Sequence, residues 1–125
     1  MKVNVDPQLL PFLYRIIAAI AVLIIVAGVL SFKLANTTVD PTHPEKASSV
    51  VTTGVFAYSR NPMYVGFVLI LLAIAIKMQN LSGYILVIIF IRYLHYFQIL
   101  PEEKMLRKLF GQQYIDYCSD VRRWL

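Results

Sequence analysis

Three apolar stretches alternate with polar segments along the chain. The first covers residues 10–32 and includes 17 residues without a charge, from Ile16 to Phe32. The second covers residues 62–77 and the third covers residues 82–100. Because about 20 apolar residues in a helix cross the hydrocarbon core of a bilayer, we interpret all three as membrane-spanning helices.

The connections predict how these helices are arranged. Asn is favoured as a helix N-cap and Pro at the first helical position, so Asn61 and Pro62 predict the start of the second helix. The short turn KMQNLSG then separates the second helix from the third, which predicts an antiparallel hairpin. The polar segment from Lys33 to Arg60 is long for an idle loop, which suggests that it has a function.

The last 25 residues, 101–125, form a polar tail with helical character. Pro101 is expected to interrupt the third helix. Residues 102–110 place apolar side chains on one side and basic ones on the other, which predicts an amphipathic helix at the membrane surface that ends at Gly111. Four residues then recur at spacings of three, four and three, which predicts one face of a final helical stretch. They are Tyr114, Tyr117, Val121 and Trp124.

Composition supports a membrane protein. The chain has 125 residues, 58% of them hydrophobic, and a mean hydropathy of +0.64. A soluble domain this small could not bury so much apolar surface, so part of it is expected to face lipid. The first apolar stretch is expected to be a retained span, since it is too long for a cleavable signal. We therefore predict one all-α integral-membrane domain over residues 1–125.

The distribution of charge predicts the orientation of the helices. The formal net charge is +5, and most basic residues lie in the loop 33–61 and in the tail 101–125. The positive-inside rule places both segments in the cytosol, where they can meet. In a membrane protein, this excess reports orientation and contact with anionic lipid, so no nucleic-acid partner is expected.

Polar residues of the third helix are the first candidates for chemistry. Arg92, His95, Gln98 and Glu102 follow spacings of three, three and four, so on one continuous helix they share a face. An ionisable group about ten residues into an apolar span, such as Arg92, by default marks a site or a water-filled cavity.

Each of these features also has a structural interpretation. Arg92 could pair with a backbone carbonyl or extend to the interface, and His95 could be a hydrogen-bonded packing residue. Glu102 and Glu103 could cap a helix, and Gly66 could let the second helix approach its neighbour closely. The single cysteine excludes an internal disulfide, and the two histidines lack ligand spacing, so no metal is expected.

Two blocks of sequence together resemble a known group of enzymes. The block TTGVFAYSRNPMYVG is similar to the signature TxGxYxxxRHPxYxG, and PEEKMLRKLFGQQYIDYCSDVRRW is similar to EExxLxxxFGxxYxxYxxxVPRW. Both signatures belong to the membrane-embedded isoprenylcysteine carboxyl methyltransferases and phospholipid methyltransferases. The blocks occur in the family's order, separated by a helical hairpin.

This resemblance implies a membrane methyltransferase that binds S-adenosylmethionine on the cytosolic side and acts on a lipid-like or prenylated acceptor. Carried over by position, the cofactor-binding residues would be Ser48, Ser49, Val50, Val51, Phe56, Asn61, Pro62, Met63, Tyr64, Glu102, Glu103, Tyr114 and Tyr117. Among them Glu103 is expected mainly to support the fold. Arg92, His95 and Gln98 would bind the substrate, and the catalytic candidates would be Arg92, His95 and Glu102.

The chain departs from the family pattern at three positions. Asn61 replaces the usual His, Arg122 replaces the Pro of the last signature, and Gln98 stands where carboxyl methyltransferases carry an Arg for the substrate carboxylate. The departure at Gln98 weakens the case for prenylcysteine as the acceptor. A carboxylate acceptor needs no base, whereas an amine or a hydroxyl needs one, for which His95 is the candidate.

Two alternatives to a methyltransferase stay open. The ending FGQQYIDYCSDV also resembles the tail of membrane sterol reductases, which use NADPH. The departures from the signatures are also compatible with a non-catalytic membrane scaffold that has the same fold.

Overall fold

The computed structural model of the protein describes residues 2–37 and 51–125, and the regular elements in these two ranges are all helical. In chain order they are α1 (Leu10–Thr37), the 3-10 helix η2 (Gly54–Ala57), α2 (Pro62–Met78), α3 (Leu81–Leu94), the π-helical segment η3 (His95–Ile99), α4 (Leu100–Phe110) and α5 (Gln112–Asp120). The parts α3, η3 and α4 form one continuous helix from Leu81 to Phe110. The predicted all-α fold class is confirmed.

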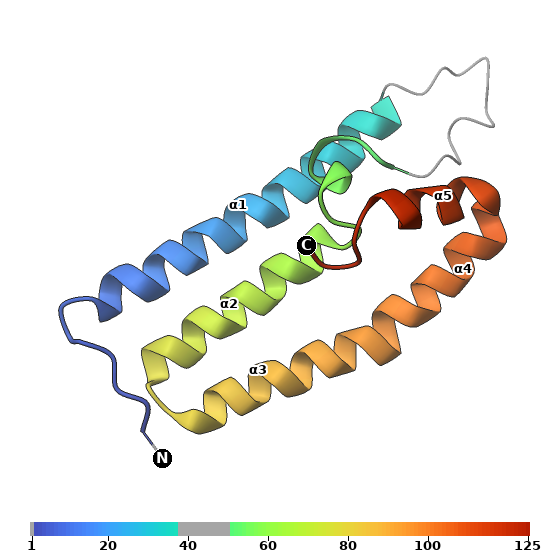
Figure 1. Ribbon diagram of the computed structural model, residues 1–125. Helices are drawn as coiled ribbons and strands as arrows, with labels where there is room; N and C mark the ends of the chain where they lie inside the picture. The colour runs from blue at the N-terminus through green and yellow to red at the C-terminus, as the bar shows by residue number, and fades with distance from the viewer. Residues whose placement is uncertain (1, 38–50) are drawn as a thin grey trace.

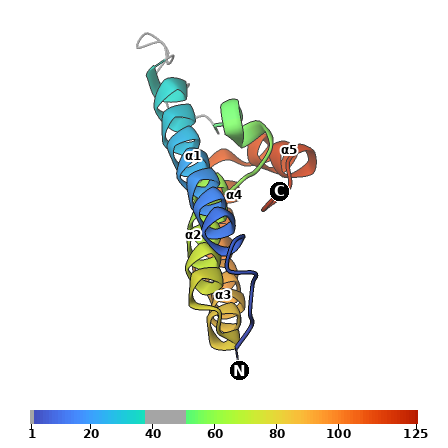
Figure 2. The ribbon, with the colours of Figure 1, turned by 90° about the vertical axis from the view of Figure 1, so that its left-hand side faces the viewer.

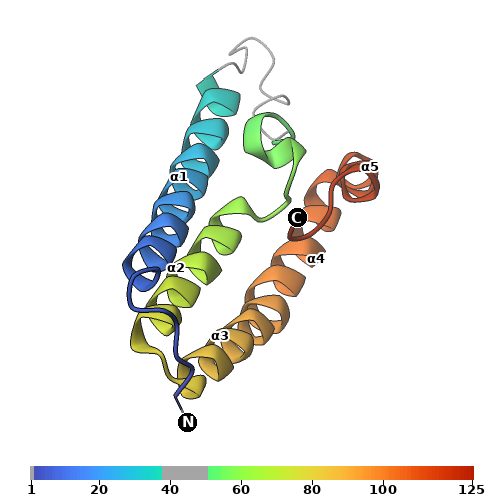
Figure 3. The same ribbon diagram turned by 60° about the vertical axis from the view of Figure 1, so that its left-hand side comes forward.

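The helices α1, α2 and α3 lie side by side in one layer with α2 in the middle (Figure 1). Seen along its edge, the layer is thin, and η2 and α5 project from one of its sides (Figure 2). Both projecting elements lie at the end of the layer where α2 begins, whereas the N-terminus lies at the opposite end, beside the turn between α2 and α3 (Figure 3). This arrangement brings the segment before α2 next to the chain's C-terminal tail.

Small residues allow the layer to pack closely. Gly66 of α2 is buried against α1, where an added Cβ would collide with the side chain of Ile25. Gly83 of α3 faces α2, and a Cβ there would lie 3.1 Å from Cβ of Ala75. Small residues at such positions let membrane helices approach each other. The packing interpretation of Gly66 is therefore confirmed.

The predicted hairpin between α2 and α3 is also confirmed. Gln79 ends α2 in the left-handed conformation with a φ of 52°, and Asn80 caps α3 by accepting a hydrogen bond from the Ser82 amide at 3.1 Å. The N-terminal segment covers this turn, because the amides of Val3 and Val5 donate to the backbone oxygen and the side-chain oxygen of Gln79.

Within the two described ranges, two helices are long and apolar enough to cross a membrane, over Leu10–Leu34 and Leu81–Phe110. The helix α2 is apolar but has 17 residues. At about 1.5 Å per residue it reaches about 25 Å, against about 30 Å for the hydrocarbon core of a bilayer. Two of the three predicted spans therefore have the expected length, and a third span in α2 stays a prediction.

The predicted break of the third helix at Pro101 is wrong. The helix continues to Phe110, and its irregularity lies just before the proline, in η3, where the amide of Leu100 donates to the carbonyl of His95 five residues earlier. Pro101 lacks an N–H, and in a regular helix its ring would clash with the carbonyl four residues before it. The wider π turn relieves this conflict without ending the helix.

The π turn has a consequence for the predicted polar stripe. One extra residue in a turn rotates the side chains of all later residues by about 100° around the helix axis, compared with their positions in a regular α-helix. Arg92 and Glu102 therefore no longer share a face. The stripe of polar residues predicted for the third helix is broken between its two ends.

The predicted final helix is shorter than expected. Gly111, with a φ of 58° and a ψ of −125°, ends α4 as predicted, and α5 begins directly after it. The helix α5 ends at Asp120, and Val121 has extended backbone. Val121 nevertheless packs with Tyr114 and Tyr117, but Trp124 does not belong to this cluster.

Candidate functional site

Hydrogen bonds join the segment before α2 to residues 112–125. We call these residues the tail from here on, because residues 101–110 belong to the continuous helix. The amide of Arg60 donates to the carbonyl of Arg122 at 3.0 Å, and Nδ2 of Asn61 donates to the carbonyl of Arg123 at 2.9 Å. Asn61 is the N-cap residue of α2, as predicted, but its side chain makes this contact to the tail instead of capping the helix. The cytosolic loop and the tail of the sequence prediction therefore do meet.

A buried carboxylate holds the tail against the continuous helix. Glu103 of α4 is 5% exposed and accepts two hydrogen bonds from Arg123, at 2.7 Å from Nε and 3.0 Å from Nη2. Nη1 of Arg60 lies 3.6 Å from the same carboxylate. The hydrogen bonds to Glu103 raise the pKa of Arg123 above its usual value. The expectation that Glu103 supports the fold agrees with this network.

Aromatic residues of α5 form a small core above this network. Tyr114, Tyr117 and Val121 are buried together, and Leu106, Phe110 and Cys118 pack around them. The hydroxyl of Tyr117 donates to the carbonyl of Phe56 at 2.7 Å, which ties α5 to η2. Burial raises the pKa of Tyr114 to about 12 and that of Tyr117 further. Both phenols are therefore neutral near pH 7.

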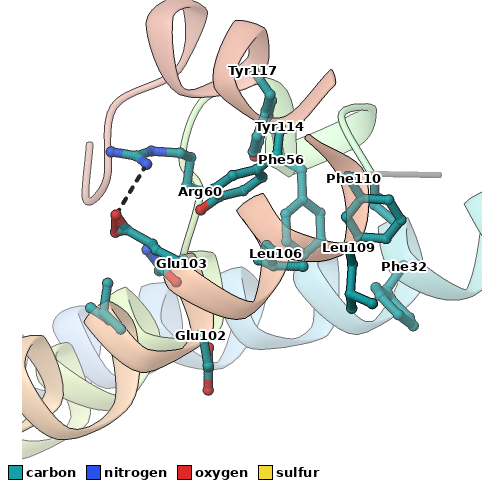
Figure 4. A pocket seen from close by; sticks show the side chains of 13 residues that line it. Phe32, Phe56, Arg60, Glu102, Glu103, Leu106, Leu109, Phe110, Tyr114 and Tyr117 are labelled. Carbon is teal, nitrogen blue, oxygen red and sulfur yellow. Dashed lines mark hydrogen bonds and ion pairs between the residues drawn. The ribbon is translucent and has the colours of Figure 1, made fainter. Parts of the chain in front are cut away.

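A cleft in two parts lies between the tail, the segment before α2, and the helices. One cavity of about 300 Å³ reaches under α5, where Leu109, Phe110, Tyr114 and Tyr117 line it; we call it the tail lobe (Figure 4). A second cavity of about 330 Å³ reaches along α2; we call it the membrane lobe. The two lobes share six lining residues, so they form one cleft. These residues are Phe32, Phe56, Arg60, Asn61, Glu102 and Leu106.

Glu102 and Glu103 have different environments although they are adjacent. In Figure 4 the Glu103 carboxylate points toward Arg60, whereas Glu102 points away from it. Glu102 is exposed in the cleft, and its Oε1 accepts a hydrogen bond of 2.5 Å from the hydroxyl of Tyr64 in α2. Consecutive residues of a helix point about 100° apart, so one side chain faces the ionic network and the other faces the cleft.

Most cofactor-binding residues predicted from the resemblance lie in this cleft. Both lobes are lined by Phe56, Asn61 and Glu102; the tail lobe adds Val51, Glu103, Tyr114 and Tyr117, and the membrane lobe adds Pro62, Met63 and Tyr64. The predictions for Ser48, Ser49 and Val50 lie outside the described residues.

The residues predicted to bind the substrate lie elsewhere in the structure. Arg92, His95 and Gln98 do not line either lobe of the cleft in the described part of the chain. Arg92 is exposed, and Gln98 is partly buried. Nδ1 of His95 lies 3.5 Å from Nη1 of Arg123, which places its ring beside the tail.

Arg60 is a cleft residue that the sequence prediction left out. It lines both lobes, and its Nη1 donates to Sγ of Cys118. Its Nε is buried and has no hydrogen-bond partner among the described residues. An orphaned buried donor is costly, so this atom is suited to an acceptor supplied by a ligand or by water. Its position in the first signature, directly before Asn61 and Pro62, could have indicated this role.

Comparison with known proteins agrees with the resemblance. The family model described as phospholipid methyltransferase matches residues 13–113. The chain is also 44% identical over 63 residues to an uncharacterized protein of Haemophilus influenzae, an alignment that covers half of this chain and all of that protein. No solved structure matches the chain. Because the family model covers well over half of the sequence, the chain belongs to the phospholipid methyltransferase family.

Proposed function

We propose that the protein is an integral-membrane methyltransferase that uses S-adenosylmethionine and methylates a lipid-like acceptor. Family membership supports the reaction class, since members of this family are membrane methyltransferases that use this cofactor. The single observation that carries the proposal for this chain is the hydrogen bond of Tyr64 to Glu102, which joins the predicted cofactor motifs across the cleft.

The polar groups of the cleft fit the cofactor. The methionine part of S-adenosylmethionine carries a carboxylate and an amino group, and its ribose carries hydroxyls. Arg60, with its unpaired Nε, would hold the carboxylate. The exposed carboxylate of Glu102 would accept hydrogen bonds from the amino group or the ribose hydroxyls.

The aromatic groups of the tail lobe fit the adenine ring. Phe56, Phe110 and Tyr114 line this lobe together, and offset or edge-on contacts between aromatic rings are favourable. Tyr114 is neutral near pH 7, so its hydroxyl can serve as a donor. The adenosyl group would therefore lie under α5, and the methionine part would extend toward Glu102.

The membrane lobe is suited to the acceptor. Met63, Tyr64 and Phe67 line it on α2, and Phe32 lines it on α1. Phe67 is 41% and Phe32 is 49% exposed, so their side chains reach both the lobe and the surface of the helical layer. A lipid could enter from the bilayer along these side chains, and its polar head would meet the cofactor next to Glu102.

The protein's contribution to the chemistry would be orientation and exclusion of water. The bound cofactor supplies a methyl group already activated by its sulfonium. Alignment of two reactants in a closed site lowers a barrier by up to about 7–11 kcal/mol in model reactions. If the acceptor is an amine, a proton has to leave it. Glu102 would accept this proton, because it is the carboxylate of the cleft that is not held by arginine.

The proposed topology has three spans with the loop and the tail in the cytosol. It is supported by the contacts between these two segments at one end of the layer and by their excess of basic residues. A water-soluble cofactor would then reach the cleft from the cytosol, while the acceptor arrives from the membrane.

Binding of the cofactor to the purified protein in detergent tests the site. Glu102→Gln removes a charged acceptor worth about 2 kcal/mol, so we expect affinity for S-adenosylmethionine to fall about 30-fold by calorimetry. Lys104→Gln, which changes an exposed residue two positions further along α4, is the matched control and should bind as the wild type does.

Transfer of a radiolabelled methyl group to total membrane lipid tests the reaction. Labelled lipid should form with the wild type and decrease strongly with Glu102→Gln. If Glu102→Gln binds the cofactor with unchanged affinity, the proposed site is wrong. If the cofactor binds but no lipid class is labelled, the protein is not the methyltransferase that we propose.

A further inference from the structure

A small cavity lies on α2 farther from the tail than the cleft. It has a volume of about 80 Å³ and only apolar lining residues, and none of them lines the cleft. They are Leu71, Ile74, Ala75 and Met78 of α2 and Gly83, Leu86 and Val87 of α3. We call this cavity the lower groove. It lies beside the turn that connects the two helices, where Gly83 packs against Ala75.

The lower groove continues the membrane lobe along one face of α2. Tyr64 and Phe67 line the membrane lobe. Leu71, Ile74 and Met78 line the lower groove. These five residues follow each other at spacings of three, four, three and four, which places them on one face of the helix. Phe67 and Leu71, where the two cavities approach each other, are one turn apart. The two cavities therefore lie in line, and we call this line of five residues the chain track.

The facing helix carries a matching row of large side chains. Leu86 of α3 lines the lower groove, and Phe90, Tyr93 and Phe97 follow it at spacings of four, three and four. These positions share the face of Leu86 on a helix. Tyr93 and Phe97 are exposed, and their ring centroids lie 5.2 Å apart. The chain track is therefore flanked by apolar and aromatic side chains of α3.

The length of the chain track matches one leaflet of a bilayer. Tyr64 and Ile74 are ten residues apart on α2, which corresponds to about 15 Å along the helix. Half of the hydrocarbon core of a bilayer is also about 15 Å thick, and one acyl chain of a lipid reaches to this depth. A chain whose polar head lies beside Glu102, the hydrogen-bond partner of Tyr64, would therefore end in the lower groove.

We propose that the chain track holds one acyl chain of the methyl acceptor, with the polar head beside Glu102 and the end of the chain in the lower groove. This inference rests on the proposed function and adds to it a subsite that selects the acceptor by the length of its chain. A chain as long as one leaflet would fill both cavities, whereas a chain of half that length would leave the lower groove unfilled. An acceptor with short chains should therefore be a poorer substrate.

The outer face of α1 provides an internal reference for ordinary contact with lipid. Ile16 of α1 is 54% exposed and Ile74 of the chain track is 48% exposed, but Ile16 lines neither the cleft nor the lower groove. The two helices run in opposite directions (Figure 1), and Nζ of Lys77 lies 5.6 Å from the ring centroid of Tyr14. Ile16 and Ile74, which are close in sequence to these two residues, therefore lie at a similar depth.

Photo-crosslinking in bilayers tests the chain track directly. The full-length protein is reconstituted in phosphatidylcholine with a small fraction of dipalmitoyl phosphatidylethanolamine that carries a diazirine at the end of an acyl chain. The amine of this probe suits the carboxylate of Glu102, and mass spectrometry identifies the labelled residues. We expect Ile74 to be labelled several times more than Ile16, because a chain held in the track stays beside it. A diazirine next to the headgroup should instead label Tyr64 and Phe67.

Two variants separate the chain track from the rest of α2. Leu71→Trp fills the track between its two cavities, and Leu72→Trp is the matched control, because Leu72 is also half-buried but lines neither cavity. Leu71→Trp should abolish the excess labelling of Ile74 over Ile16, and Leu72→Trp should retain it. Both variants should bind S-adenosylmethionine as the wild type does, since neither position lines the cleft.

The same variants predict how methyl transfer depends on chain length. Loss of even one methylene contact in an apolar pocket costs about tenfold or more, so kcat/KM of Leu71→Trp for the dipalmitoyl lipid should fall at least about tenfold. Its kcat/KM for the dioctanoyl lipid, whose chains do not reach past Leu71, should stay close to that of the wild type. Leu72→Trp should leave both values unchanged.

Each contrary result has a defined meaning. Equal labelling of Ile74 and Ile16 in the wild type, or equal kcat/KM for both chain lengths, would overturn the proposal. Protection of Ile74 from the probe would also overturn it, because another protein surface would then cover the track. Failure of the proposed function differs from these results, since transfer would then be absent for both chain lengths; the pattern of labelled residues would still decide whether the track holds an acyl chain.

Discussion

Glu103 is the carboxylate on which the attachment of the tail to the helical layer depends, and Glu103→Gln removes its charge with little change in size. The carboxylate accepts hydrogen bonds of 2.7 and 3.0 Å from Arg123 and lies 3.6 Å from Arg60. With a neutral amide in its place, two guanidinium groups lose their common counter-ion. We expect the tail to detach from the layer more often.

The size of the effect follows from the burial of the three side chains. The side chain of Glu103 is 6% exposed, that of Arg60 is 11% exposed and that of Arg123 is 30% exposed. Breaking a buried ion pair by removing one partner costs about 3–5 kcal/mol. Because Arg123 can turn toward water, we expect the lower end, about 3 kcal/mol, which corresponds to an approximately 100-fold increase in the open population of the tail.

The single cysteine of the chain provides the assay. Cys118 lies on α5, is partly buried, and packs against the aromatic core of the tail. When opening and closing are fast, the rate of its reaction with a thiol reagent is proportional to the open population. The rate in Glu103→Gln should therefore rise about 100-fold, after normalisation to the rate in denaturant, which reports the intrinsic reactivity of the thiol.

Two further variants control this experiment. Glu102→Gln changes the neighbouring carboxylate, which faces the cleft, and should leave the labelling rate within about twofold of the wild type. Arg123→Gln removes the arginine that donates to Glu103 and leaves the surroundings of the cysteine unchanged. It should accelerate labelling by about the same factor as Glu103→Gln. A labelling rate in Glu103→Gln within about twofold of the wild type would refute the reasoning that the buried ion pair holds the tail.

Three other changes have defined outcomes. Gly66→Leu should destabilise the contact of α1 with α2 by about 1–3 kcal/mol, because the side chain would overlap Ile25, and the melting temperature in detergent should fall. Gly111→Ala should lower the stability of the tail by about 1–3 kcal/mol through backbone strain alone, because the φ of 58° and ψ of −125° suit glycine while nothing within 4 Å blocks a Cβ. Labelling of Cys118 should therefore accelerate, and an unchanged labelling rate would contradict this prediction. A membrane-impermeant maleimide should label Cys118 only from the cytosolic side of vesicles, and Gln79→Cys in a cysteine-free background only from the other side; labelling of both from one side would exclude the proposed topology.

The sequence by itself determined the helices and most of their ends. The apolar runs, the Asn61-Pro62 start of α2 and the break at Gly111 are local signals, because they depend on the conformational preferences of a few adjacent residues. It also indicated that the loop and the tail meet, since the two signatures flank a hairpin whose ends must lie on the same side. The contacts from Arg60 and Asn61 to the tail confirm that meeting.

Only the tertiary structure decided what individual polar side chains do. The spacing of Arg92 and Glu102 placed them on one face, but the π turn before Pro101 rotates them apart. Helix periodicity and capping preference do not distinguish Glu102 from Glu103; only the resemblance to the family suggested that Glu103 supports the fold. In the structure Glu102 faces the cleft, and Glu103 is buried between two arginines. The physical reason is that the environment of a helical side chain is set by the segments packed against that face, and here those segments lie 20 to 43 residues away in sequence.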